Sequence, residues 1–107
     1  MSVMNVNDDS FQDQVFTTDM LVLAEFSGAG SDSAQTGRMI DDLAEEFEDQ
    51  VLMLRVDTDS SEATAENFAV DSVPTVIFFR SGSEVSRMTG LCDVDDYRQE
   101  VEKLLRD

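Results

Sequence analysis

Three runs of four or five consecutive apolar residues constrain the fold of this chain most strongly. They are Met20–Ala24, Val51–Leu54 and Val76–Phe79. A strand that is covered on both faces is apolar throughout, so these runs predict central strands of a sheet with helices on both sides. Between the runs, apolar residues return at helical spacing, and no repeat or Gly/Ser-rich linker interrupts them. We therefore expect an α/β fold that forms one domain over residues 1–107.

The remaining segments complete the predicted element order. The cluster Asp8–Ser10 is expected to cap a first helix, and Asp59 with Glu62 to cap a short helix that ends near Phe68. Ser81–Ser83 is typical of a hairpin turn, so the last two strands are expected to be antiparallel. Strands are predicted at 3–6, 20–24, 51–57, 73–79 and 84–88, with helices after the first three and after the last.

This order, with its local sequences, resembles the thioredoxin family over nearly the whole chain. The segments that carry the resemblance are Asn7–Phe11, Leu21–Phe26, Met39–Phe47, Val70–Phe79 and Ser81–Val85, in the same order as in the family. The resemblance implies a thioredoxin fold, with a mixed central sheet of four to five strands and about four flanking helices. It also implies that the peptide bond before Pro74 is cis.

The redox motif of the family is missing. When the alignment is counted back without gaps from Met39–Phe47, the motif Trp-Cys-Gly-Pro-Cys falls on Ala29–Ser33, so that Gly30 and Ser33 replace the two cysteines. Gly30 has no side chain, and the Ser33 hydroxyl is not a redox group. The same count places Ala24 where the family has a buried carboxylate. We therefore expect no catalytic residues and no dithiol-disulfide activity.

The resemblance leaves a groove as the candidate site. Its expected residues are Ala29, Gly30, Ser31, Asp32, Ser33, Val73, Pro74 and Gly90. A proline at this place leaves the backbone of the preceding Val73 free to pair with an extended peptide. Ser31, Asp32 and Ser33 can instead serve as caps of the helix that follows them.

The composition excludes several classes of function. A net charge of −17 repels nucleic acid and anionic lipid, and no apolar run is long enough to span a bilayer. There is no histidine and only one cysteine, so catalytic Ser-His pairs and zinc sites are excluded. We expect no metal and no cofactor. The first nine residues lack the features of a secretory signal, which favours a cytoplasmic location.

These observations predict a redox-inactive, thioredoxin-like protein that binds a protein or an extended peptide in the groove, as a chaperone-like module. One alternative is weak thiol chemistry at Cys92, although Asp93, Asp95 and Asp96 oppose a thiolate there. Another is a salt-adapted, acidic subunit of a larger assembly.

Overall fold

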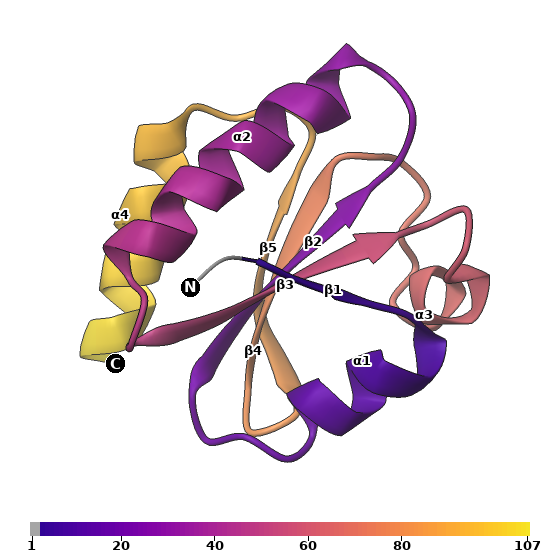
Figure 1. The fold of residues 1–107 in the computed structure, drawn as a ribbon. Helices are drawn as coiled ribbons and strands as arrows, with labels where there is room; N and C mark the ends of the chain where they lie inside the picture. The colour runs from indigo at the N-terminus through magenta and orange to yellow at the C-terminus, as the bar shows by residue number, and fades with distance from the viewer. Residues whose placement is uncertain (1–2) are drawn as a thin grey trace.

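The computed structural model describes residues 3–107, and its strands form one mixed sheet in the order β1-β3-β2-β4-β5 (Figure 1). The strands are β1 (Met4–Val6), β2 (Leu21–Ser27), β3 (Val51–Asp57), β4 (Thr75–Arg80) and β5 (Ser83–Thr89). The helices are α1 (Asp8–Val15), α2 (Ser31–Glu46), α3 (Glu62–Asn67) and α4 (Val94–Arg106). The predicted α/β class and element order are confirmed.

Strand β2 lies at the centre of the sheet, as its apolar sequence predicts. It pairs in parallel with β3, which in turn pairs in parallel with β1. On its other side β2 pairs antiparallel with β4, and β4 pairs antiparallel with β5. All residues from Leu21 to Phe26 are buried. Because β1, β2 and β3 are parallel to one another, their carboxyl ends meet at one edge of the sheet.

Helices cover both faces of the sheet and divide the core in two. Figure 1 shows α2 and α4 on one face, and α1 and α3 on the other. One core cluster includes Leu23, Ile40 and Tyr97 on the α2 and α4 side. The second includes Phe11 of α1, which packs edge-on against Phe79 with ring centroids 5.7 Å apart. Neighbouring residues of β2 therefore point to different helices.

The hairpin between β4 and β5 forms where it was predicted. Ser81 and Gly82 connect the strands, with φ angles of 52° and 81°. Two consecutive positive φ angles match the twist of antiparallel strands, and Gly82 adopts its angle without steric cost. The sequence Ser-Gly-Ser thus sets the register of this edge of the sheet.

Two of the predicted helix caps are wrong. Helix α1 has Asn7 as its N-cap, one residue before the predicted cluster; the Asn7 side chain accepts from the Ser10 N–H, and the Ser10 hydroxyl accepts in turn from the Asn7 N–H. Helix α3 begins after Ser61, and no side chain caps it. Asp59 instead belongs to a short turn that directly follows β3, in which its N–H donates to the Asp57 carboxylate.

The start of α2 also differs from expectation. Residues Ser31–Ser33 form the first turn of the helix instead of a loop, and Gly30 occupies the N-cap position without any side-chain cap. Gly30 has a φ angle of 115°, which a residue with a side chain adopts only with strain. The predicted capping by Ser31, Asp32 or Ser33 is therefore wrong, since all three lie beyond the N-cap.

Candidate functional site

The segment before β4 is held by two hydrogen bonds, one of them to the residue that follows β5. The peptide bond between Val73 and Pro74 is cis, as the resemblance implied. The Pro74 carbonyl accepts from the Gly90 N–H at 2.8 Å, and the Thr75 hydroxyl donates to the Ser72 carbonyl at 2.9 Å. Within the part of the chain that the structure describes, no hydrogen bond engages the backbone of Val73.

The turn that leads from β2 into α2 packs directly against Val73. A β-carbon at Gly28 would lie 3.0 Å from Cγ2 of Val73, so a larger residue there would require Val73 to shift by a few tenths of an ångström. The Gly28 N–H donates to the Ser33 hydroxyl at 3.2 Å. The two segments of the predicted groove are therefore brought together through Gly28, which the sequence analysis did not single out.

The predicted groove residues differ in their exposure. Ala29, Gly30, Ser31 and Asp32 are exposed, Val73 and Gly90 are half-buried, and Ser33 and Pro74 are buried. The Ser33 hydroxyl is occupied by Gly28, so its role here is to hold the turn. The accessible part of the site consists of the α2 start and the Val73 backbone.

Cys92 lies next to this site. Its side chain is half-buried against the core cluster between the sheet and α4, and its thiol donates weakly to the Gly90 carbonyl at 3.7 Å. It is the only cysteine of the chain. An internal disulfide is therefore impossible.

The structure also contains a buried ion pair that sequence reasoning missed. Glu25 of β2 is fully buried, and its Oε1 accepts from Nε of Arg55 in β3 at 2.8 Å. Nη2 of Arg55 donates to the Gly37 carbonyl and to Oδ1 of Asp41, both on α2, at 3.1 and 3.0 Å. Burial raises the pKa of the Glu25 carboxyl above its usual range, and Arg55 offsets only part of this effect.

This pair corrects the assignment of Ala24. Ala24 belongs to the core cluster with Phe11 and Phe26, on the sheet face opposite to α2. Because successive side chains of a strand alternate, Glu25 is the residue that points toward α2. A buried carboxylate near the start of α2 is thus present at residue 25, and the ungapped count was wrong by one residue. A charged residue directly after each of two apolar runs, Glu25 and Arg55, was the signal that could have revealed it.

A comparison with protein families agrees with this architecture, since the thioredoxin family model matches residues 2–103. The chain belongs to the thioredoxin family. A thioredoxin of Porphyra purpurea is 31% identical over 91 residues, which cover 84% of this chain and 85% of that protein. Thioredoxin 1 of Nostoc sp. is 26% identical over 101 residues, or 94% of each chain. The chloroplastic thioredoxin M4 of Arabidopsis thaliana is 28% identical over 106 residues, which cover 98% of this chain and 55% of that protein.

Two further features of this thioredoxin-family chain bear on its partners. Within residues 3–107, no helix is both long and apolar enough to cross a bilayer. No cluster of three or more His, Cys, Asp or Glu side chains in the same residues is arranged to hold a metal ion.

Proposed function

We propose that this member of the thioredoxin family binds an extended segment of a partner protein, as a chaperone-like module without redox activity. The observation that supports this proposal most is the Val73 backbone, which is unpaired beside cis-Pro74 and packs against the turn that leads into α2. An unpaired peptide unit at the end of a strand can add an extended segment by main-chain hydrogen bonds. A location in the cytoplasm remains part of the proposal.

The residues at the start of α2 support binding rather than thiol chemistry. The cysteine positions of the family fall on Gly30 and Ser33 in the count from Met39–Phe47, and on Ser31 and Ala34 in a count from Glu25; none of these residues carries a thiol, and the Ser33 hydroxyl already accepts from the Gly28 N–H. A serine without a neighbouring base is not an activated nucleophile. The exposed backbone of Ala29 and Gly30 still offers a surface for a peptide that pairs with Val73.

A second candidate function uses the thiol of Cys92. Its half-exposed position beside Gly90 favours this alternative, because a peptide in the groove would pass close to it. The thiol would attack a disulfide of the partner, form a mixed disulfide and release the other partner sulfur as a thiolate. If this is the activity, Cys92→Ser abolishes thiol transfer to a small disulfide such as oxidised glutathione.

The binding proposal is tested by capture of partners from the native cell extract. Immobilised wild type, a Pro74→Ala/Asp32→Ala variant and an Asp42→Ala control are compared at low and moderate salt, and captured proteins are identified by mass spectrometry. Asp42 is exposed on α2 and lies beyond the groove, so the control also loses one carboxylate there. The proposal expects a partner that wild type and control retain and the groove variant loses. Equal capture by all three proteins would refute it.

A further inference from the structure

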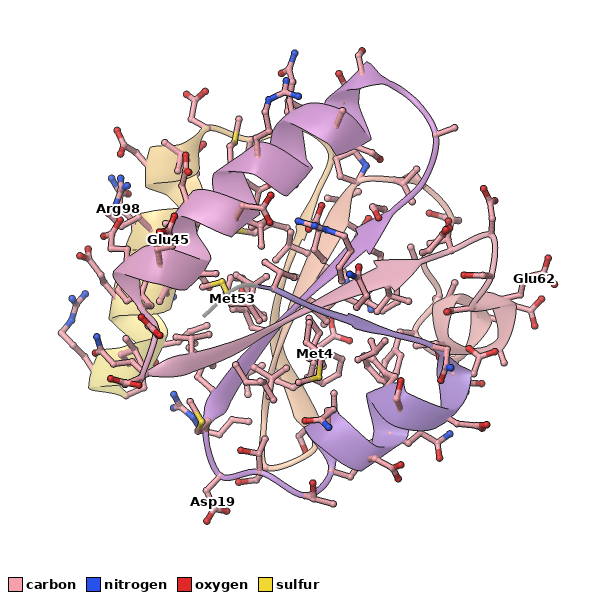
Figure 2. All side chains as sticks on the ribbon, viewed as in Figure 1. Met4, Asp19, Glu45, Met53, Glu62 and Arg98 are labelled. Atoms are coloured by element: carbon pink, nitrogen blue, oxygen red, sulfur yellow. The ribbon has the colours of Figure 1, made fainter. Side chains whose placement is uncertain are left out.

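An apolar pocket opens at the amino end of β3, beside the edge of the sheet that β1 forms. Its volume is about 530 Å³, and ligand pockets commonly measure roughly 300–1,000 Å³. Its lining includes Met4, Met20, Leu52 and Met53, of which Figure 2 labels Met4 and Met53. Met4 is 40% exposed and Met20 36%, so apolar surface faces the solvent here. Exposed apolar surface with a polar rim is typical of interaction sites.

The pocket reaches from this exposed surface down to the core. Its lining also includes Val3, Ala44 and Val51, which are buried and belong with Met53 to the core cluster between the sheet and α2. A methionine side chain is unbranched and has three rotatable bonds, so the methionines of the lining can adapt to apolar groups of different shape. The pocket therefore suits a large apolar side chain, such as leucine, methionine or phenylalanine.

The charge around the pocket selects a ligand that carries a cation beside its apolar group. Among the described residues that line the pocket, only Glu48 and Asp49 are charged, and both are exposed. They follow the carboxyl end of α2, where the helix dipole adds negative potential. A lysine or arginine next to the apolar side chain of the ligand is therefore attracted to this rim.

The same charge argues against two other occupants. Anionic lipid headgroups are repelled by the carboxylates of Glu48 and Asp49. A second copy of this chain carries a net charge of −17, so repulsion opposes the association of two copies. A basic segment of a different protein matches both the apolar lining and the acidic rim.

The edge of β3 beside the pocket is open. The pairing of β1 with β3 begins at Met4 and Leu54. Within residues 3–107, no strand therefore pairs with Val51–Met53 on the side of β1. An open strand edge can add an extended segment by main-chain hydrogen bonds. A segment that lies along this edge places its side chains next to the pocket.

This pocket is separate from the proposed peptide groove. Met20 and Val51 lie at the amino ends of β2 and β3, whereas the turn at Gly28 follows the carboxyl end of β2. Strand β2 has seven residues and a strand rises about 3.3 Å per residue, so about 20 Å separate its two ends. Binding in the pocket therefore does not depend on the groove.

We propose that this pocket is a second docking site, which binds a basic, extended segment of another protein. One large apolar side chain of the segment enters the pocket, and a neighbouring lysine or arginine pairs with Glu48 or Asp49. The backbone of the segment lies along Val51–Met53. This site goes beyond the proposed function, since it needs neither the groove nor its ligand.

The probe is the peptide acetyl-Gly-Lys-Leu-Leu-Lys-Gly-amide, titrated into protein that carries ¹³C in its methionine methyl groups. We expect saturable shifts of the Met4, Met20 and Met53 signals, while Met39 on α2 and Met88 on β5 keep theirs. Serine in place of both leucines should abolish the shifts. Glutamine in place of both lysines should weaken binding about fivefold, as expected for two exposed charge pairs. Equal binding of all three peptides to the unchanged protein would overturn the proposal.

Three variants localise the binding. Met20→Gln replaces an exposed apolar side chain and should weaken the lysine peptide at least about fivefold. Glu48→Gln/Asp49→Asn should weaken the lysine peptide about fivefold and leave the affinity of the glutamine peptide unchanged. Asp59→Asn/Glu62→Gln removes two exposed carboxylates near the start of α3 (Figure 2) and should retain wild-type affinity. Equal weakening by the two double variants would reduce the effect to the general acidic field and overturn the proposal.

Two further results would assign the pocket differently. If the Met4, Met20 and Met53 signals shift with protein concentration alone, a second copy occupies the pocket and the proposal is refuted. If Pro74→Ala/Asp32→Ala no longer binds the lysine peptide, the peptide binds in the groove and the pocket proposal fails. Wild-type affinity of that variant for the peptide supports a separate site. The groove proposal is then decided by its own capture experiment, whatever the peptide shows.

Discussion

Arg55 Nε donates to Glu25 Oε1 at 2.8 Å, and the two residues lie directly opposite each other in the parallel pair of β2 and β3. The same guanidinium reaches the Gly37 carbonyl and Asp41, so one side chain joins two strands to α2. This link fixes the helix whose first turn forms one wall of the proposed groove. The position of the groove therefore depends on a buried charge pair.

Loss of Arg55 should destabilise the fold. Arg55→Met leaves the Glu25 carboxylate buried without a counter-charge, and removal of one partner of a fully buried pair costs about 3–5 kcal/mol. Because Arg55 is 25% exposed, we expect a smaller loss, about 2–3 kcal/mol, in the free energy of unfolding measured with urea. Arg98→Met, which breaks the surface pair with Glu46, should cost clearly less (Figure 2). A loss at Arg55 no larger than that at Arg98 would contradict this role.

Glu25 should make the stability depend on pH. Its pKa is raised in the folded protein, so between the ordinary pKa of 4.5 and the raised pKa the folded state binds more protons than the unfolded state. The free energy of unfolding contributed by this group therefore falls as pH rises through that range. The glutamine of Glu25→Gln does not titrate. The free energy of unfolding of the variant should therefore increase relative to that of wild type as pH rises. Urea unfolding from about pH 4 to about pH 8 measures it, and a constant difference would exclude this contribution.

Tyr97 offers a second titration that can be followed alone, because the chain has one tyrosine and no tryptophan. Burial, with a smaller contribution from Cys92, raises the pKa of its phenol from 10.0 to about 12. Tyrosinate absorbance after a rapid pH jump should therefore rise near pH 12 in the folded protein and near pH 10 in urea. Since the folded pKa is the higher, the stability that depends on this group falls as pH rises from 10 to 12. A folded-state midpoint at 10 would show that the phenol is not buried in solution.

The fold could be predicted from the sequence because it depends on local patterns. The run Met20–Ala24 predicted a central strand, and Ser81–Ser83 predicted the hairpin, since apolar continuity and turn residues act over a few positions. The cis bond at Pro74 followed from the family resemblance. These features need no knowledge of which strands are neighbours.

The ion pair and the helix starts could not be predicted in this way. Glu25 and Arg55 are 30 residues apart, and only the register of β2 against β3 places them together. An alignment shifted by one residue exchanges the two faces of a strand, which is why Ala24 was assigned instead of Glu25. Ser31–Ser33 contain no apolar residue, so the hydrophobic pattern shows no helix there until Met39.

The acidic surface should make the melting temperature sensitive to salt. Figure 2 shows Asp19, Glu45 and Glu62 on well-separated parts of the molecule, and the net charge is −17. From about 0.1 M to about 1 M NaCl the Debye length falls from about 10 Å to about 3 Å, which screens repulsion between such groups. We expect the melting temperature to rise steadily over this range. A melting temperature that does not change with salt would show that charge repulsion does not limit the stability, and it would refute the salt-adaptation alternative.

The most direct test of the central claim is the affinity of a captured partner for wild type, Cys92→Ser and Pro74→Ala, measured by calorimetry with and without dithiothreitol. Binding through the groove without thiol chemistry predicts equal affinities for wild type and Cys92→Ser, no effect of the reductant, and at least about tenfold weaker binding by Pro74→Ala. Loss of binding by Cys92→Ser or in dithiothreitol, with Pro74→Ala unaffected, would contradict the account and identify the thiol as the functional group.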